Sequence, residues 1–422
     1  MLALAGCGST SPTPYERFGQ APSALRPMSP LPPMTGQPAG PGGAQTASAP
    51  PGQRVALLAP LTGPNAQRGT ALAQAAKLAL DQPGSPALDV IDTQGTPEGA
   101  AAAATTAING GAGLLLGPLT APETAAAAGP ASAAGIAMLA FTSDPAQARP
   151  GVWVLGLTST QQVRRLVGAS MAQGKSRFAA LLPPTDFGRA MSDALSQAAA
   201  AAGATADIRT VDGSSMQAAN AAVRDLSGYV GRRGPIDAQI KAARLAPGPD
   251  SRKQVAELSR RGIPAPAFDA LLLASTGDAL GQLTSLLPYY DVDRPAVRLL
   301  GPALWAVPSA RGGADLSGAW FAAPDPAARA AFDQQYTARF GNPAPGLADL
   351  AYDAASIARV TMQAGGFSQA SLTRPEGFSG VDGVLGLQPD GTVRRGLAVF
   401  EIQRGGAQIV EPAPDSLTAP GT

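Results

Sequence analysis

From residue 54 onward, the chain alternates short apolar runs with longer segments whose apolar residues recur at helical spacing. The run at residues 55–59, Val-Ala-Leu-Leu-Ala, is continuous, as a strand buried on both faces requires. The pattern then predicts helix 70–81, strand 88–91, helix 97–109, strand 114–117, helix 123–134 and strand 137–141. Strands and helices that alternate at this spacing indicate parallel βαβ units with right-handed crossovers.

A second series of the same kind follows the apolar run at residues 152–157. It predicts helix 160–173, strand 178–182, helix 188–202, strand 205–211, helix 216–232, strand 270–274, helix 278–287 and strand 297–300. Residues 234–266 are rich in Arg, Lys, Pro and Gly, and we expect them to form a solvated helix with loops inserted in the second series.

The last part of the folded chain returns to a helical pattern and then ends in strands. The pattern favours helices within 319–322, 327–340 and 347–364, followed by strands 386–388, 397–403 and 408–410. Asp390-Gly391 predicts a hairpin turn. Two series of units need two cores, so the expected fold class is α/β, with two lobes that contain parallel sheets.

Composition separates the two ends of the chain from this folded part. Residues 8–53 consist mainly of Pro, Gly, Ser, Thr and Ala, which bury too little apolar area to offset the entropy of ordering, so we expect a disordered tether. Stretched toward polyproline geometry, the tether could reach on the order of 140 Å. We expect residues 413–422 to be a disordered tail.

Histidine is absent, and cysteine and lysine are scarce. These counts exclude Ser-His-Asp triads and His-ligated zinc, and a single cysteine cannot form a thiolate metal site. A net charge of +1 does not favour nucleic acid. We therefore expect a binding protein that is not an enzyme and holds no cofactor or metal. Gly168 to Ser176 ends like a phosphate-binding loop, but it joins a helix to a strand, which is the reverse of the required context.

The only cysteine, Cys7, ends the sequence Leu4-Ala5-Gly6-Cys7. This pattern is typical of the site where a bacterial lipoprotein precursor is cut and lipidated, so residues 1–7 predict a shortened signal and lipobox. A secretion signal needs an apolar run of about 7 to 15 residues, and only six precede Cys7. Either the true start lies upstream, or Cys7 is an ordinary terminal cysteine. Gly8, rather than Asp, after Cys7 favours the outer membrane.

Two loops of the first lobe follow buried strands, and each opens a helix. One contains Leu119 and Thr120, with Glu123 three residues after the threonine, and the other contains Phe141, Thr142 and Ser143. Thr120 and Glu123 fit a capping box, which is sufficient as a structural role. The amides and hydroxyls of both loops could instead hold an anionic group, because ligands of open α/β sheets bind at the carboxyl ends of strands. Both interpretations remain open from the residues alone.

The second lobe offers four further candidates. Asp186 and Asp278 follow predicted strands, where each could cap a helix or receive a ligand ammonium. Phe187 could pack against its own helix or close over a ligand. Trp305 lies where the chain should cross back between the lobes, and it could serve as hinge packing or as a wall of the cleft. We favour packing for Trp305.

Several motifs together resemble the type 1 periplasmic binding fold of leucine/isoleucine/valine-type receptors. The matching segments are residues 55–80 with their Pro-Leu-Thr-Gly-Pro turn, 115–119 (Leu-Leu-Gly-Pro-Leu), 186–189 (Asp-Phe-Gly-Arg), 269–272 (Asp-Ala-Leu-Leu), 299–301 (Leu-Leu-Gly), 350–355 (Leu-Ala-Tyr-Asp-Ala-Ala), and 380–387 with 389–391. Within this fold, the tethered, Pro-rich chain is similar to lipoprotein activators of class A penicillin-binding proteins. Those activators carry an N-terminal helical-repeat domain, where this chain has a tether.

The resemblance implies two Rossmann-like lobes joined by three crossovers. It assigns residues 54–158 and 302–380 to the first lobe, and 159–301 and 381–412 to the second. In amino-acid receptors of this fold, the strand-end loops hold the ligand carboxylate, which corresponds to residues 119, 120 and 141–143. The second-lobe aromatic corresponds to Phe187, where many receptors have tyrosine, and the ammonium-binding acid falls close to Asp278.

Two functions follow from this resemblance as expectations. In the first, an outer-membrane lipoprotein in the periplasm activates a class A penicillin-binding protein through a protein interface. In the second, the chain is the receptor of an ABC transporter, which binds an amino acid or a small amide and presents it to the permease. The long tether favours the activator, because a transporter receptor needs only a short leash.

Overall fold

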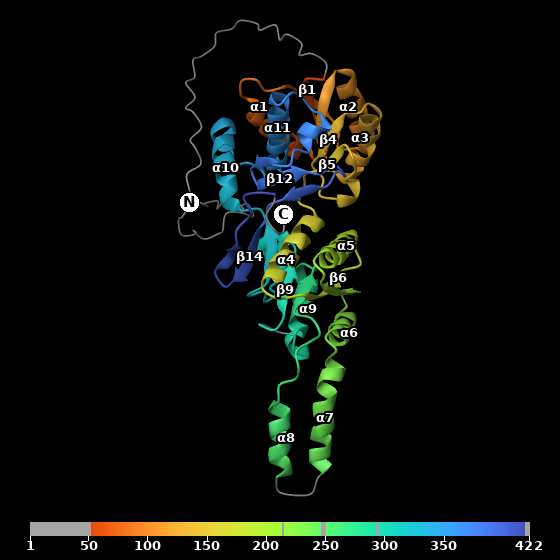
Figure 1. Cartoon of the computed structure of the whole chain (residues 1–422), viewed down its shortest axis with the longest axis vertical. Helices are drawn as coiled ribbons and strands as arrows, with labels where there is room; N and C mark the ends of the chain where they lie inside the picture. The colour runs from red at the N-terminus through yellow and green to blue at the C-terminus, as the bar shows by residue number, and fades with distance from the viewer. Residues whose placement is uncertain (1–51, 213–214, 246–249, 293–294, 418–422) are drawn as a thin grey trace, which may run out of the picture.

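The computed structural model describes residues 52–212, 215–245, 250–292 and 295–417, and it has two lobes stacked end to end (Figure 1). Each lobe is built around its own mainly parallel β-sheet, which confirms the predicted α/β fold class. Cys7, the predicted tether as far as residue 51, and the last five residues of the predicted tail lie outside the described residues. Among the described residues, the helices are too short or too polar to cross a membrane.

The sheet of the first lobe has the strand order β2-β1-β3-β4-β5, and all of its strands are parallel. Its strands are β1 (Arg54–Ala59), β2 (Ala87–Asp92), β3 (Ala112–Leu116), β4 (Ala137–Ala140) and β5 (Val152–Val154). Val55 and Leu57 of β1 point into one core, whereas Ala56 and Leu58 point into the other. Because side chains of a strand alternate between faces, a run without polar residues indicates burial on both sides.

Helices cover both faces of this sheet. They are α1 (Ala66–Leu80) and α11 (Ala348–Gln363) on one face and α2 (Pro97–Asn109) and α3 (Ala121–Ala133) on the other, with α10 (Pro326–Phe340) and α12 (Gln369–Leu372) alongside the first pair. Helices α1 and α11 pack directly against each other. Ala76 and Ala354 are fully buried there, and their small side chains leave room for the two helices to lie close together.

The sheet of the second lobe has the order β15-β14-β10-β9-β8-β6-β7. Its strands are β6 (Arg177–Leu182), β7 (Thr205–Thr210), β8 (Ala270–Leu273), β9 (Arg298–Gly301), β10 (Trp320–Ala323), β14 (Ala398–Gln403) and β15 (Gly406–Glu411). Strands β6 to β10 are parallel, whereas β14 and β15 form an antiparallel edge. Antiparallel strands can be joined by a tight turn, so β14 and β15 form a hairpin, whereas the parallel strands need helical crossovers.

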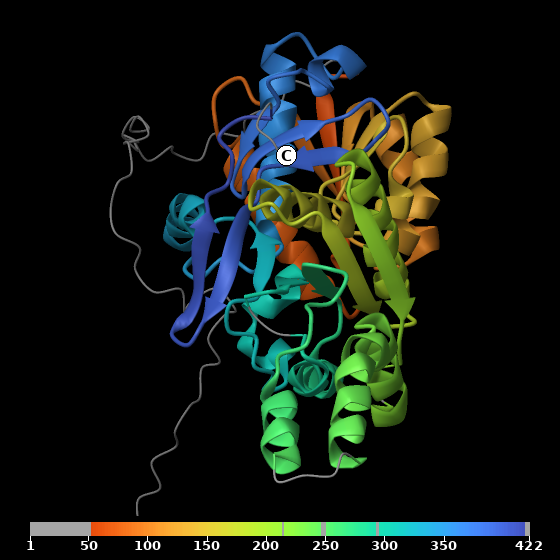
Figure 2. The same cartoon turned by 60° about the horizontal axis from the view of Figure 1, so that its bottom comes forward.

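Helices also cover both faces of the second sheet. They are α4 (Ser159–Ala172) and α5 (Asp186–Ala201) on one face, and α6 (Met216–Leu226) and α9 (Gly277–Leu286) on the other. Two further helices, α7 (Tyr229–Leu245) and α8 (Ser251–Arg260), pack against each other and project away from the lobe (Figure 2). They fulfil the expectation of solvated helix in the Arg- and Pro-rich insertion.

A small antiparallel sheet completes the first lobe. It consists of β11 (Phe378–Gly380), β12 (Gly383–Leu387) and β13 (Val393–Arg395). The predicted hairpin turn at Asp390 and Gly391 is confirmed, and it joins β12 to β13. Gly391 has a φ of 91°, and a Cβ atom there would lie 2.2 Å from the carbonyl oxygen of Arg149, so glycine is required on both grounds.

The chain crosses between the lobes at residues 155–158, 324–325 and 396–397, in agreement with the expected three crossovers. The crossings depart from the predicted lobe boundaries in two places. Residues 302–323 were assigned to the first lobe, with a helix at 319–322, but Trp305 lies in the core of the second lobe and β10 is a strand of the second sheet. Residues 383–395 were assigned to the second lobe, but Leu385 and Val393 lie in the core of the first.

One predicted helix is divided in two. The pattern at 216–232 suggested a single helix, whereas α6 ends at Leu226 and α7 starts at Tyr229. Gly228 between them has a φ of 62°, a conformation that ends a helix and that glycine adopts without strain. The division separates α6, which packs on the second sheet, from α7 and α8, which project away from it.

Candidate functional site

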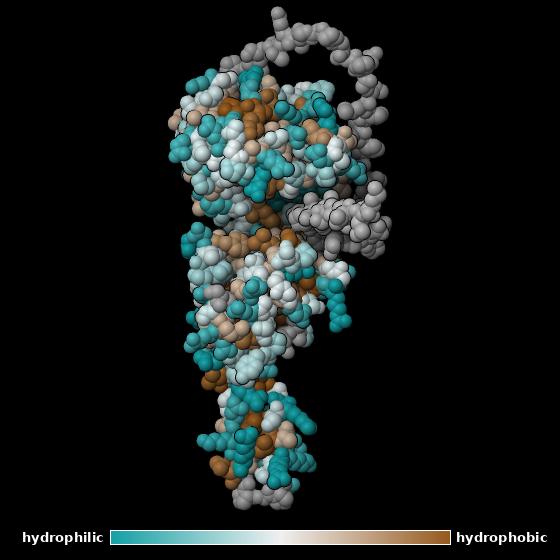
Figure 3. Space-filling view, turned by 180° about the vertical axis from the view of Figure 1, so that it is seen from behind, coloured by the Kyte–Doolittle hydropathy of each residue, from teal (hydrophilic) through white to brown (hydrophobic). Residues whose placement is uncertain are grey.

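A cleft of about 690 Å³ lies between the lobes. Gly156, Leu157 and Pro324, which belong to the crossings, line it together with residues of both lobes. Figure 3 shows the constriction between the lobes, where apolar side chains reach the surface. Because hinge segments line this cleft, its shape changes when the lobes move. A group bound in the cleft can therefore bias the relative position of the two lobes.

The strand-end loops of the first lobe lie in the wall of this cleft, where Leu119, Thr120, Phe141, Thr142 and Ser143 are all found. The capping box is also present. The Thr120 hydroxyl donates to Glu123 Oε2 at 2.6 Å, and the Thr120 amide donates to the same oxygen at 3.1 Å. Glu123 itself is fully buried. The donors of Thr120 are therefore already used within the protein.

The neighbouring loop, which contains Thr142 and Ser143, has hydroxyl groups that remain available for hydrogen bonds to an occupant. Thr142 is 6% exposed, and its hydroxyl oxygen accepts a hydrogen bond from the Asp144 amide at 3.1 Å. The hydroxyl proton of Thr142 is not required for that bond and can point into the cleft. Ser143 is exposed at the cleft surface. This loop therefore offers two hydroxyl groups to an occupant of the cleft.

The second lobe contributes an apolar wall. It consists of Phe187, Pro302, Ala303, Leu304, Ala306 and Val307, together with Gln162. Gln162 Oε1 accepts from the Ala303 amide at 2.8 Å, and its Nε2 donates to the Thr158 carbonyl at 3.2 Å. The polar ends of this glutamine thus hold the hinge together, and the surface beside them is hydrophobic.

Three candidates from the sequence lie elsewhere. Asp186 forms an ion pair with Arg189 and faces a second hollow of about 680 Å³. Asp278 is exposed in the first turn of α9, outside the cleft lining. Trp305 is fully buried in the second-lobe core, where Nε1 donates to the Ser275 carbonyl at 3.2 Å. Each follows a strand end, but a position after a strand does not fix the direction of the side chain.

The sequence did not reveal a charged cluster in the cleft wall. Asp349 of α11, Asp382 of the turn before β12 and Arg395 of β13 all line the cleft, as does Arg68 of α1. Asp349 and Arg395 are 5% and 3% exposed. Because buried charges need partners, the contacts of these groups define what the site can do.

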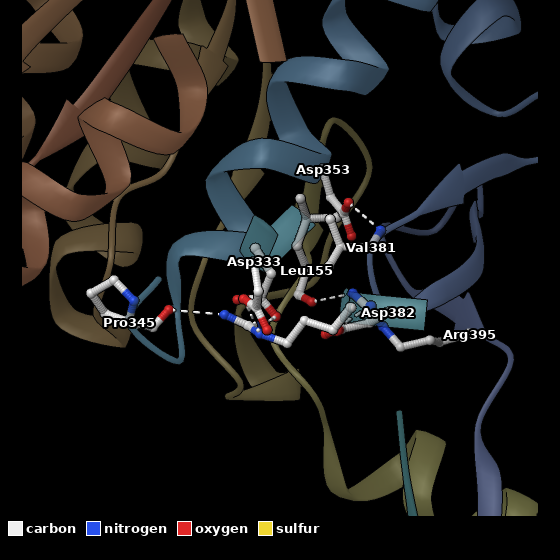
Figure 4. A network of polar contacts seen from close by, with 9 residues as sticks. Leu155, Asp333, Pro345, Asp353, Val381, Asp382 and Arg395 are labelled. Carbon is white, nitrogen blue, oxygen red and sulfur yellow. Dashed lines mark hydrogen bonds and ion pairs between the residues drawn. The ribbon is translucent and has the colours of Figure 1, made fainter. Parts of the chain in front are cut away.

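Arg329 and Arg395 hold the cluster together, and Figure 4 shows Arg395 beside Leu155 and Asp382. Arg329 contacts Asp349 at 2.9 Å and donates to the Pro345 carbonyl at 3.1 Å. Arg395 donates to the Leu155 carbonyl at 2.8 Å, and its Nη1 lies 3.8 Å from Asp382. Arg395 therefore connects the small sheet of the first lobe to the hinge.

A third carboxyl group, that of Asp353, lies one turn further along α11. It accepts the Val381 amide at 2.7 Å and is 1% exposed. Burial raises the pKa of Asp353 to about 7, and Asp382 adds to the effect while Arg395 opposes it. Burial and the nearby Asp382 carboxyl also raise the pKa of Asp349 well above its ordinary value. Both shifts favour the protonated, neutral form of these buried carboxyl groups.

Some polar atoms of this wall have no hydrogen-bond partner among the described residues. They are Asp349 Oδ1 and Arg395 Nε and Nη1. An unpaired buried donor or acceptor costs about 1–3 kcal/mol, so an occupant that bonded to these atoms would be favoured. Within the described part of the chain, no group of His, Cys, Asp or Glu side chains is arranged to hold a metal ion.

A local signal for part of this cluster was present in the sequence. Asp349 and Asp353 are four residues apart in an Ala- and Leu-rich helix, so they lie on the same face as its buried residues. Carboxylates on an apolar helix face indicate buried acids. Asp382 and Arg395 join them only through the tertiary fold.

Comparisons with known proteins point to one family. The sequence profile described as periplasmic binding protein matches residues 52–407. The fold is similar to that of a putative branched-chain amino acid ABC transporter protein from Rhodospirillum rubrum, with a TM-score of 0.62, 17% identity, and coverage of 85% of this chain and 99% of that one. None of the curated proteins compared with the chain matches it.

The fold is also similar to that of the C-domain of LpoA from Haemophilus influenzae, described as a regulator of PBP1A. The TM-score is 0.56 at 17% identity, and the match covers 85% of this chain and 99% of that domain. Against full-length LpoA, the TM-score is 0.55, and the chain spans 59% of that protein. The similar structures therefore include both transporter binding proteins and a regulator, and at this identity they establish the fold alone.

Proposed function

This chain belongs to the periplasmic binding protein family, and from that premise we propose that it is a non-catalytic regulator that activates a class A penicillin-binding protein through a protein interface. The family indicates a location outside the cytoplasm, and its members among the similar structures are binding proteins and regulators. The proposal includes lipidation at Cys7, anchoring in the outer membrane, and a tether that spans the distance to the partner.

The observation that carries this proposal is the chemistry of the two cleft walls. An α-amino acid needs groups that hold both its carboxylate and its ammonium. The amide and hydroxyl of Thr120 are already bonded to Glu123, and the wall opposite consists of apolar groups such as Phe187 and Leu304. This arrangement supports a cleft that adjusts the angle between the lobes over one that captures a free amino acid.

The proposal is tested by binding and activation together. The full chain, from Cys7 onward, is immobilised and presented with purified class A penicillin-binding proteins of the organism that encodes it. We expect saturable binding to at least one of them, and an increase in its rate of glycan polymerisation or cross-linking when the chain is added. Failure to bind any of these synthases would refute the proposal.

A second function is favoured by a different observation. The cleft has the volume of a small-molecule site, and Asp349 Oδ1 and Arg395 Nη1 are buried there without hydrogen-bond partners. The alternative is therefore the receptor of an ABC transporter for an amino acid or a small amide, which would close around its ligand and dock on a permease.

A thermal-shift screen against amino acids and small amides separates the two functions. For a receptor, a ligand should raise the unfolding temperature saturably, and Thr142→Ala should abolish the shift because Thr142 lines the cleft. Asp278→Ala is the matched control, since Asp278 is exposed outside the cleft lining. No shift with any compound, combined with binding to a synthase, would exclude the receptor.

A further inference from the structure

The second sheet does not require the helices α7 and α8. A parallel crossover from β7 to β8 needs one helix packed on the sheet, and α6 provides it through Ala219 and Val223. The chain nevertheless inserts two more helices before β8, and they form the narrow arm at the end of the molecule opposite the first lobe (Figures 1 and 3). The arm is defined here by its described residues, 229–245 and 250–262.

The arm is firmly seated on the second lobe. Arg232 donates to the carbonyls of Tyr290 at 2.6 Å, Pro264 at 2.8 Å and Asp291 at 3.4 Å. Tyr229 meets Tyr290 edge to face, with ring centroids 5.1 Å apart. Contacts to three carbonyls and an aromatic pair fix the base of α7, so the arm has a defined direction.

Further out, the two helices pack on each other. Ile236, Ile240 and Ala243 of α7 are buried, while Val255 and Leu258 of α8 are half-buried. α7 is about 25 Å long at 1.5 Å per residue, so it carries its outer end well away from the sheet. A structure of this length that the lobe does not need for its own core is available for contact with another molecule.

The arm is strongly basic. It contains eight Arg and Lys against three Asp and Glu, a net charge of +5, whereas the whole chain has a net charge of +1. The exposed cations are Lys241, Arg244, Arg252, Lys253, Arg260 and Arg261. None of these six forms an ion pair with another residue that the structure describes. Leu245 is 77% exposed beside the basic residues at the outer end of α7.

We propose that the arm is the docking surface for an acidic surface of the partner protein. Asp237, Asp250 and Glu257 are interspersed among the cations. A uniformly anionic lipid surface would repel these acids, whereas a protein surface can pair each charge with its opposite and so fix the register. The exposed Leu245 supplies an apolar contact beside the exposed basic residues at the outer end of α7. This inference deepens the proposed function and rests on it, because it names the surface through which the synthase is bound.

The test compares two charge reversals in the full chain. Arg244→Glu with Arg252→Glu changes the outer end of the arm. Lys77→Glu with Arg404→Glu is the matched control, because both residues are exposed on other parts of the molecule. Binding to the class A synthase is measured at about 50 and 200 mM salt, and circular dichroism verifies that both variants fold.

We expect the arm variant to bind about tenfold more slowly at the lower salt concentration and to lose most of its salt dependence, because cations of this kind steer association. The control should stay within about twofold of the wild type. Wild-type binding kinetics in the arm variant would overturn the inference and leave the proposed function standing. If instead the wild type binds vesicles of anionic phospholipid and only that binding is lost in the arm variant, the arm faces a membrane and the inference is wrong. If the wild type binds no synthase, the proposed function fails and the inference fails with it.

Discussion

We expect the buried carboxyl groups of Asp349 and Asp353 to make stability depend on pH, and Asp353→Asn tests this directly. Asp353 Oδ1 accepts the Val381 amide, whereas Oδ2 has no hydrogen-bond partner among the described residues. An asparagine can keep the bond to Val381 with its oxygen and place an NH₂ group where the protonated acid carries its proton. The variant thus imitates the protonated state at every pH.

The magnitude follows from the shift of the pKa of Asp353 from 3.8 to about 7. The folded chain holds a proton that the unfolded chain has released, so the stabilisation is complete below about pH 4 and is lost as the pH rises through 7. A shift of about three units corresponds to about 4 kcal/mol, or about 1.4 kcal/mol per pH unit within this window. Asp349, whose pKa is raised in the same direction, adds to the slope.

The assay is urea unfolding of the full chain between pH 5 and 7. The chain has no histidine, so side chains with ordinary pKa values do not titrate there. The free energy of unfolding of the wild type should fall as the pH rises. That of Asp353→Asn should fall less steeply, by about 1.4 kcal/mol per pH unit, because the variant has no proton to release at this position. Asp333→Asn is the matched control, because it removes a half-exposed carboxylate that pairs with Arg329, the partner of Asp349. An unchanged slope in Asp353→Asn would refute the reasoning.

Three further changes test the packing and the arm. Trp305→Ala removes a fully buried indole and its bond to Ser275, and should lower the free energy of unfolding by about 3–5 kcal/mol in urea titrations, with a smaller loss in Trp305→Phe. Glu123→Ala removes the carboxylate that accepts from Thr120, and should lower the free energy of unfolding by about 1–3 kcal/mol in the same titrations. An unchanged free energy of unfolding would show that water replaces the carboxylate. Arg232→Ala removes the hydrogen bonds from the arm to three carbonyl groups, so amide hydrogen exchange in α7 and α8 should become faster while the sheet stays protected. Arg233→Ala removes only an ion pair with Asp237 and should leave the exchange rates unaltered.

The order of strands and helices in the two lobes followed from local pattern, because strands buried on both faces form short apolar runs that differ clearly from amphipathic helices. The strand β10 is the instructive exception. Its sequence, Trp-Phe-Ala-Ala, is only four residues long and precedes an Ala-rich helix, so periodicity could not identify it. Its pairing with β9 and β14 makes it a strand, and that pairing is tertiary.

The candidate site was predictable in part. The loops at Leu119 and Phe141 were found because parallel strands bring their carboxyl ends to the same edge of the sheet. The cluster of Asp349, Asp382 and Arg395 was not found, since its members come from three segments that meet only when the small sheet folds onto the first lobe. The second-lobe acid lies outside the cleft lining for another reason: α9 begins at Gly277, and Asp278 is exposed in its first turn.

The helical insertion shows what composition alone can and cannot give. Its Arg and Lys content predicted solvated helix, which the structure has in α7 and α8. The position of the break at Gly228 was signalled only by a single glycine. That the two helices form an anchored arm depends on Arg232 and its carbonyl acceptors, which lie about 30 and 60 residues away in the sequence.

The central claim is that the two-lobed chain acts by binding a peptidoglycan synthase. The most direct measurement is the synthesis rate of a purified class A penicillin-binding protein with and without the full chain. We predict a saturable increase in that rate, with half-saturation at the concentration where the two proteins bind. An unchanged rate at saturating chain, accompanied by saturable thermal stabilisation of the chain by an amino acid, would contradict the account.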